Sequence, residues 1–208
     1  MIPTTFPTTF LTSSPHYEQA LVRFLREYTP LSDEDIRRAA PLWREKHYAK
    51  HDFFNARMNV CTSLGYVLQG VFRVYYLNED GEEINIFFFA EHQFCVSFKS
   101  FTTQTPCQYY VESLSDALVL EIRFADLQEL YRTSHGWERF GRRFAEDCFT
   151  VSQLRTESFL FQTPEERYVS FQAAYPDLAN RISLSHIASF LGVQLPSLSR
   201  IRKRLAER

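Results

Sequence analysis

Several features that mark secreted, membrane and metal-binding proteins are missing from this sequence of 208 residues. Its four cysteines are scattered without a C-x2-C pair, which predicts reduced, mostly buried thiols rather than a zinc site, an iron–sulfur cluster or disulfides. No run approaches the roughly 18 apolar residues that cross a bilayer. The N-terminus lacks the positive start and apolar core of a signal peptide. We therefore expect a cytoplasmic protein without a membrane partner.

The sequence also lacks the motifs of common enzyme classes. It contains no P-loop, no G-x-S-x-G and no G-x-G-x-x-G. His47 and His51 have the spacing of a helical metal pair, but they fall in a predicted strand and turn, where that spacing does not bring the rings together. We find no catalytic constellation, and we expect no enzyme activity, no bound metal and no fixed cofactor.

A strong excess of one charge is missing too, but the charge is unevenly distributed. The net charge is −2 over the whole chain, whereas residues 163–208 hold seven Lys and Arg against four Asp and Glu. Hydrophobic residues make up 45% and aromatic residues 16%, as in a globular protein with a sizeable core. This distribution predicts a basic terminal module attached to an acidic body.

Periodicity divides the chain into an N-terminal β-rich part and a C-terminal helical part, which together form an α+β protein. After a loose arm over residues 1–15, we expect helices over 16–28 and 31–43. Short β-rich runs follow from Trp43 to Ile122, separated by turn signals such as HDFFN, NEDG and LSD. This spacing predicts an antiparallel β-roll, and we assign residues 16–133 to it.

A long helix is predicted from Ser134 to Phe161. At 1.5 Å per residue it would be roughly 40 Å long, which is more than a small roll can cover. Its apolar residues recur every three or four positions, and this stripe predicts a dimer contact over residues 134–162. The alternative is a helix packed wholly on its own domain. The residues of the stripe are Trp137, Phe140, Phe144, Cys148, Val151 and Leu154.

Thr163 and Pro164 open the last segment, residues 163–208, with the start signal of a helix. Further on, Gly192 separates two short helical patterns and is suited to the left-handed conformation that ends a helix. The apolar and small residues around it fit a helix-turn-helix. They are Ile187, Ala188, Leu191, Val193, Leu198 and Ile201.

The second of these helices carries only basic and hydroxyl side chains on the face that is left outside the core. Such a face can enter the major groove of DNA, where arginine pairs with guanine. The other interpretation is a solvated basic surface. The candidate DNA-binding residues are Ser197, Ser199, Arg200, Arg202, Lys203 and Arg204.

From Pro30 to Leu205 the sequence resembles the Crp/Fnr family of bacterial transcription regulators. The resemblance lies in LGYVLQGVFRVYYLNEDGEE, in PEERYVSFQAAYPDLANRISLSHIASFLGV and in LSRIRKRL, and it is greatest for the branch common in Bacteroidetes. It implies a cyclic-nucleotide-binding-like jelly roll, a dimerisation helix and a helix-turn-helix whose wing is short or missing. It also implies double-stranded DNA, a second copy of the chain and RNA polymerase as partners. The Ser199-Arg200 pair matches the family motif and takes its base- and phosphate-contacting role.

Two departures limit this resemblance. The family holds the phosphate of cyclic nucleotides with a Gly-Glu pair and an Arg-Ser pair, whereas Val96-Ser97 and Gln108-Tyr109 stand at those positions here. Without the arginine, burying a phosphate would be costly, so we expect that cyclic AMP and cyclic GMP do not bind. The pocket either holds another ligand or is filled by side chains; its candidate residues are Phe94, Ser97, Phe98, Gln108 and Tyr109.

The second departure is Pro196, which stands where many members carry a base-reading glutamate. We therefore expect an operator that differs from the common palindrome of the family. The competing hypothesis is a ligand-sensing or protein-interaction module with weak or no DNA binding. The effector, the target genes and the direction of regulation do not follow from the sequence.

Overall fold

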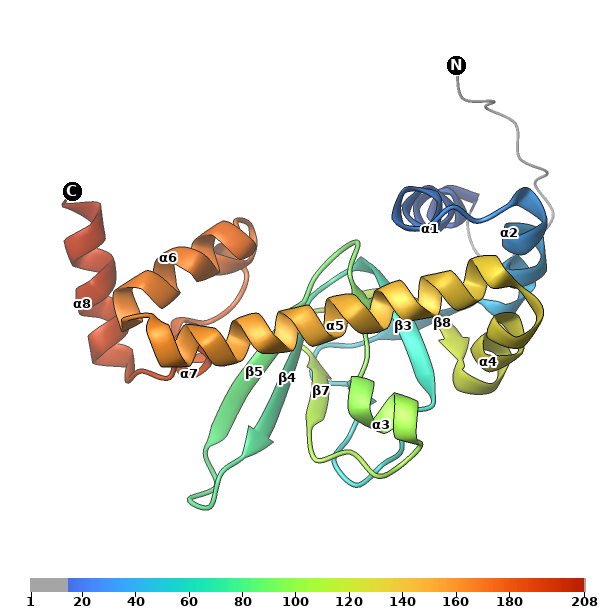
Figure 1. Ribbon diagram of the computed structural model, residues 1–208. Coiled ribbons are helices and arrows are strands. Elements are labelled where there is room, and N and C mark those ends of the chain that lie inside the picture. Colours follow the sequence, from blue (N-terminus) through green and yellow to red (C-terminus); the bar gives the residue numbers. More distant parts are fainter. Residues whose placement is uncertain (1–14, 208) are drawn as a thin grey trace.

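The computed structural model describes residues 15–207, so all but the last residue of the predicted arm lies outside the described residues. Two helices, α1 (Pro15–Tyr28) and α2 (Asp33–Ala39), precede a β-roll. Helix α4 (Phe124–Thr133) and the long α5 (His135–Phe161) follow it. Figure 1 shows α5 crossing the roll and reaching the three terminal helices beyond it. The predicted order of elements is confirmed.

The roll consists of two antiparallel four-stranded sheets. One has the order β1-β8-β3-β6 and the other β2-β7-β4-β5, so β5 is an edge strand. The strands are β1 (Arg44–Tyr48), β2 (Phe53–Asn55), β3 (Ser63–Gln69), β4 (Phe72–Leu77), β5 (Glu83–Phe89), β6 (Phe94–Cys95), β7 (Tyr110–Ser113) and β8 (Ala117–Arg123). The NEDG hairpin joins β4 to β5, as predicted, and the Asn78 side chain accepts from the amide of Glu82 at 2.8 Å.

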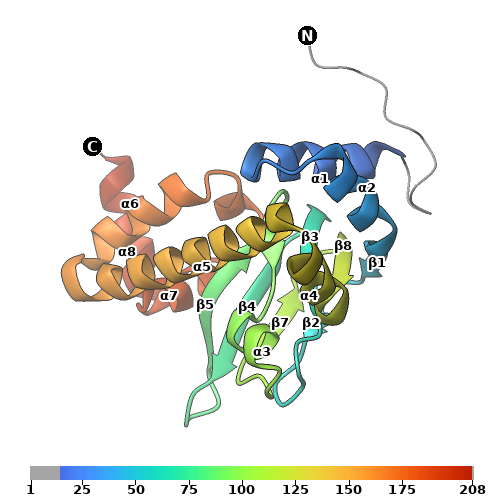
Figure 2. The same cartoon turned by 45° about the vertical axis from the view of Figure 1, so that its right-hand side comes forward.

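Two segments differ from the prediction. HDFFN is not only a turn, because three of its residues form β2, which pairs irregularly with β7. Between β6 and β7 the chain forms a short helix, α3 (Phe98–Thr103), for which no periodic signal is visible. In Figure 2 α3 lies at the foot of the roll, near β7. Both elements are too short to show a hydrophobic period, and tertiary contacts decide their conformation.

Strand β8 is apolar on both faces because both faces are covered. Ala117 and Val119 point between the two sheets, whereas Leu120 and Ile122 point toward the helices. Alternation of side chains along a strand produces this division. The helices that cover the outer face are α1, α2, α4 and the first half of α5, which share one apolar core with β3 and β8 (Figures 1 and 2).

The apolar stripe of α5 divides into two halves. Trp137, Phe140 and Phe144 lie in the core of the roll and are at most 9% exposed. They have no surface left for a second chain, so the prediction that they form a dimer contact is wrong. Cys148 is half-buried, and Val151 and Leu154 are 48% and 59% exposed. The first half of the helix thus packs on the roll, whereas the second half has an apolar side that no other part of the described chain covers.

The terminal segment contains α6 (Pro164–Ala174), the short 3-10 helix η2 (Leu178–Asn180), α7 (Leu184–Leu191) and α8 (Leu195–Ala206). Thr163 caps α6 with a capping box in which Glu166 is the partner, as TPEER predicts. No strand follows α8 as far as residue 207. Among the helices of residues 15–207, none combines the length and apolar character needed to span a bilayer.

Candidate DNA-binding helix and effector pocket

Helices α7 and α8 meet around Gly192 in the arrangement that the sequence predicts. Ser183 caps α7, and Gly192 has φ +67°, in the left-handed region where a side chain would be strained. The amides of Gly192 and Val193 return to carbonyls of the last turn of α7 at 3.1 and 3.0 Å. A Cβ at Gly192 would also lie 2.7 Å from the ring of Phe159, the residue of α5 that the turn touches.

The predicted packing residues of the helix-turn-helix share one apolar cluster. Ile187, Ala188, Leu191, Leu198 and Ile201 are each at most 5% exposed, and half-buried Val193 packs against them. At about 25 cal/mol for each Å² of apolar surface removed from water, this burial is the main force that holds two such short helices together.

The outward side of α8 carries the predicted DNA-binding residues. Ser199, Arg200, Arg202 and Lys203 are exposed, and Ser197 is half-buried. At 100° per residue, Ser199, Arg200 and Lys203 lie opposite the buried Leu198 and Ile201. Pro196 stands in the first turn, as predicted, on the same outward side. Figure 1 shows α8 at the far end of the molecule from the roll.

Three basic side chains of α8 differ in the contacts that they already make within the chain. The guanidinium of Arg204 pairs with Glu165 of α6 at 2.9 Å while its side chain stays 58% exposed, so a contact with DNA would compete with this ion pair. Lys203 reaches Glu207 only at 3.9 Å and is 81% exposed. Arg200 folds back on its own helix, with Nη2 3.2 Å from the Ser197 hydroxyl. Lys203 and Arg200 both remain accessible.

Helix α7 docks the terminal segment onto the outer face of the β2-β7-β4-β5 sheet. The Ser189 hydroxyl donates to the carbonyl of Glu83 at 2.8 Å and accepts from the amide of Asn85 at 3.0 Å. The Ser189 hydroxyl therefore satisfies backbone groups at the edge of β5 that does not pair with another strand. Phe88 of β5 extends into the apolar cluster of the terminal segment, with its ring centroid 5.4 Å from that of Phe190.

A buried ionic cluster lies beneath α7. Arg73 of β4, 5% exposed, donates from Nε and Nη2 to Glu112 at 2.9 and 2.6 Å and from Nη1 to Glu83 at 2.5 Å. Burial opposes the charge of Arg73, but these carboxylates outweigh it and raise its pKa. His186 of α7 approaches Arg73 Nη1 at 3.3 Å; burial, then the arginine charge, lowers the pKa of His186.

This docking surface was not predicted from the sequence. Its only signal was Arg73 and Glu112 standing inside otherwise apolar strand patterns. The register places them side by side in a cross-strand pair, since Arg73 is opposite Glu112. Charges inside strands need partners on the same face, and here the partners come from α7 and the neighbouring strands.

Two arginines join the turn of the helix-turn-helix to the rest of the chain. Arg155 of α5 donates to the carbonyl of Phe190, and Arg167 of α6 donates to the carbonyl of Leu191 at 3.0 Å. These carbonyls end α7, where cations are favoured by the helix dipole. Burial lowers the pKa of Arg155 to about 10, and its guanidinium lies over the rings of Phe159 and Phe190.

A cavity of about 530 Å³ lies between the roll, α1, α5 and the end of α6. Of the predicted pocket residues it contains Phe94, Ser97, Phe98 and Tyr109. Gln108 is exposed and does not line it, so that assignment is wrong. Since the cavity is open, the alternative that side chains fill the pocket is wrong.

In the family that the sequence resembles, two positions hold the phosphate of the nucleotide; neither carries a cation in this protein. Val96 and Ser97 are 6% and 5% exposed, and the Ser97 hydroxyl is 2.7 Å from the Cys107 sulfur. Tyr109, at the second position, is an aromatic residue that lines the cavity. A bound phosphate at these positions would meet apolar groups and an already bonded hydroxyl.

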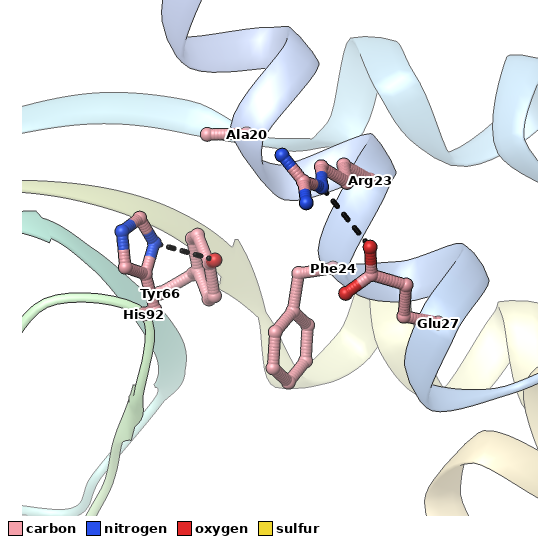
Figure 3. A pocket seen from close by; sticks show the side chains of 6 residues that line it. All are labelled: Ala20, Arg23, Phe24, Glu27, Tyr66 and His92. Atoms are coloured by element: carbon pink, nitrogen blue, oxygen red, sulfur yellow. Dashed lines mark hydrogen bonds and ion pairs between the residues drawn. The ribbon is translucent and has the colours of Figure 1, made fainter.

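A smaller hollow of about 360 Å³ adjoins the cavity and shares Phe24 and His92 with it. Figure 3 shows its polar groups: Arg23 pairs with Glu27 along α1, and the Tyr66 hydroxyl meets the His92 ring. Arg23 is 82% exposed and already paired, so it does not replace the missing phosphate-binding arginine.

Comparison with known proteins agrees with this architecture. Residues 45–134 match the cyclic nucleotide-binding domain family. FixK2 from Bradyrhizobium japonicum has 18% identity over 79% of this chain and 85% of its own, with a TM-score of 0.69. CLP, a c-di-GMP-responsive global regulator from Xanthomonas campestris, has 16% identity over 85% and 92%, with a TM-score of 0.65.

The catabolite activator protein of Thermus thermophilus is a third structural neighbour, with 16% identity over 88% of this chain and 87% of its own and a TM-score of 0.55. No curated protein sequence is detectably similar to the chain. The chain therefore has a jelly roll of the cyclic nucleotide-binding domain type followed by helices, as in solved structures that include a protein of the Crp/Fnr family. At 16–18% identity, these likenesses concern the fold of the chain.

Proposed function

We propose that the protein is a sequence-specific DNA-binding transcription regulator that does not respond to cyclic AMP or cyclic GMP. The observation that carries this proposal is the outward face of α8. Its accessible charges are all positive, and the opposite face is locked into a helix-turn-helix core by Leu198 and Ile201. A rigid helix with a hydroxyl- and arginine-bearing face is suited to the major groove. RNA polymerase is the further partner that such a regulator would contact.

The regulator acts as a homodimer in this proposal. The second half of α5 leaves an apolar surface uncovered, with Val151 and Leu154 on the side that continues the buried stripe of the first half. Pairing two α5 helices there would remove this surface from water. It would set two α8 helices about 34 Å apart, one turn of DNA. Leu154→Glu should give monomers in sedimentation velocity at concentrations where the wild type is dimeric.

DNA binding is tested first by selecting bound sequences from genomic fragments and then by fluorescence anisotropy on the selected site. The affinity should fall steeply between low and moderate salt, because each neutralised phosphate releases a counterion. A salt-independent affinity would contradict the proposal and favour a ligand-sensing or protein-interaction module without DNA binding.

Two substitutions on α8 separate base reading from phosphate contact. Arg200→Ala should cost about 1–3 kcal/mol on the selected site and relax its sequence preference. Lys203→Ala should weaken binding to all sequences alike and reduce the salt slope by about 1. Arg23→Ala, which removes an exposed arginine of α1, is the matched control and should change neither quantity. An unchanged affinity in Arg200→Ala would show that α8 does not present this face to DNA.

The absence of a cyclic nucleotide response is tested by isothermal titration calorimetry. Cyclic AMP and cyclic GMP should give no heat of binding, because no arginine among the described residues lines the cavity beside Val96-Ser97 or Tyr109 to bind the phosphate in bidentate fashion, and the one lining lysine, Lys99, is exposed. Micromolar affinity for either nucleotide would overturn this part of the proposal.

A further inference from the structure

We infer that the cavity between the roll and α5 binds an aromatic monocarboxylate. The inference deepens the proposed function, on which it rests, by naming the ligand class of the effector pocket. The cavity of about 530 Å³ falls within the range of about 300–1,000 Å³ typical of small-molecule sites. Its walls come from the roll, both long flanking helices and the terminal segment, so a ligand there would touch every part of the molecule that regulation has to connect.

The walls are predominantly aromatic. Rings of α1, β5, α3 and α5 surround the space, with Phe94 and Phe144 in edge-to-face contact at 5.3 Å and Phe98 packed on Phe144 at 5.8 Å. Aromatic rings prefer such offset and edge-on arrangements, and an aromatic ligand extends them. A polyanionic or sugar-containing ligand would leave its hydroxyl and phosphate groups against these apolar walls at a high cost.

The polar side chains of the walls restrict the ligand further. Ser97 is bonded to Cys107, and Asp147 accepts from the Tyr28 hydroxyl. His92 is bonded to the hydroxyl of Tyr66. Lys99 of α3 is the only lysine or arginine among the described residues that line the cavity, it is exposed at its edge, and it has no acidic partner. One ammonium at the edge of an aromatic cavity fits one carboxylate on an aromatic body.

The position of the cavity connects ligand binding with the DNA-binding segment. Phe87, Phe88 and Phe89 of β5 all line the cavity, and Phe88 also belongs to the apolar cluster that contains Phe190. A ligand in the cavity would therefore contact a ring that packs in the core of the helix-turn-helix. Tyr175, which follows α6, lines the cavity directly. Binding would therefore favour the docked position of the terminal segment.

Calorimetry on the full chain without DNA tests the inference, with 2-naphthoate as the probe. We expect a dissociation constant below about 100 µM. The aliphatic decanoate should bind at least about tenfold more weakly, since it loses the ring contacts. Lys99→Gln should weaken 2-naphthoate about five- to tenfold, and Lys50→Gln, an exposed lysine of the β1–β2 turn, should leave the affinity unchanged.

Ser152→Trp supplies an independent readout. Ser152 is an exposed residue of α5 that lines the cavity, so an indole there would occupy the ligand space without disturbing the core. We expect loss of 2-naphthoate binding with an unchanged thermal unfolding midpoint in the absence of ligand. No binding by the wild type, equal affinity for decanoate, or an unchanged affinity in Ser152→Trp would each overturn the inference. Because DNA is absent, these results do not depend on whether the protein binds DNA.

Discussion

The two helices of the helix-turn-helix bury one face each in the same apolar cluster, yet their remaining surfaces differ. Helix α7 is covered on its other side by β5, where Ser189 pairs with the strand edge and His186 meets Arg73. The other side of α8 faces away from the roll and carries accessible basic residues. One helix therefore anchors the motif to the roll, and the other leaves its basic face accessible.

This difference indicates how ligand binding could act on DNA binding without any direct contact between the cavity and α8. The docked helix shares β5 with the cavity, and the turn between the helices is held by Arg155 and Arg167. A change at β5 would move α7, and the rigid turn would carry α8 with it. Regulation of this kind requires that the whole helix-turn-helix move as a rigid body between two positions, without a change of its internal structure.

The largest effect is expected where the roll and the terminal segment share a core. Phe88→Ala should destabilise the protein by about 3–5 kcal/mol, because its ring is 2% exposed and packs against Phe171 and Phe190. It should also separate the unfolding of the terminal segment from that of the roll. Urea denaturation followed by tryptophan fluorescence and by circular dichroism would show two transitions. Coincident transitions with Phe88→Ala would mean that β5 does not couple the two parts.

Phe53→Ala is the matched control for this experiment. Phe53 lies in the same sheet but is 44% exposed, so its removal should cost less than about 1 kcal/mol. A similar loss in both variants would indicate a general weakening of the sheet and not a core shared by the roll and the terminal segment.

A serine on each helix offers a direct comparison of intermediate size. Ser189→Ala removes two hydrogen bonds to β5 and leaves the buried Asn85 with an unpaired amide, which should cost about 1–2 kcal/mol. Ser199→Ala removes only a bond to the carbonyl of Leu195 within α8 and should change stability by less than about 0.5 kcal/mol. Thermal unfolding measures both. Equal effects would show that α7 is no better anchored than α8.

The same contrast explains which features the sequence could predict. The outward face of α8 follows from helical periodicity once Gly192 fixes the turn, because residues on one face are set by their spacing. The docking of α7 depends on where β5 lies in space, and spacing along α7 carries no such information. Likewise, the apolar stripe of α5 is continuous in the sequence, and only the fold decides that Phe140 is covered by its own domain and Leu154 is not.

The pocket shows a similar limit. The sequence places aromatic residues and excludes a phosphate-binding arginine, and the structure brings four of the five predicted residues to one cavity. Gln108 lies outside it because the chain before β7 is irregular, so alternation could not be extended to that position. Tyr175 comes from a segment more than 60 positions later, and no local pattern could place it there.

The smallest effect concerns the protonation of His186, which distinguishes α7 from α8 by pH alone. Burial and then the charge of Arg73 lower the pKa of His186 from its usual 6.5, so the neutral ring is the form that accepts from Arg73. The unfolded chain then takes up the proton more readily. The stabilisation is complete above pH 6.5 and is lost as the pH falls through the lowered pKa of the folded state. Because the ring is partly exposed and solvent screens its charge, we expect a loss of less than about 1 kcal/mol between pH 7.5 and 5.5.

Urea denaturation at both pH values measures this loss. The control is His186→Gln, which keeps an acceptor for Arg73 but cannot titrate, and it should lose less stability than the wild type over this interval. An identical pH dependence in the two proteins would show that His186 does not feel the buried arginine, and Arg73 would then hold α7 through its carboxylate partners alone.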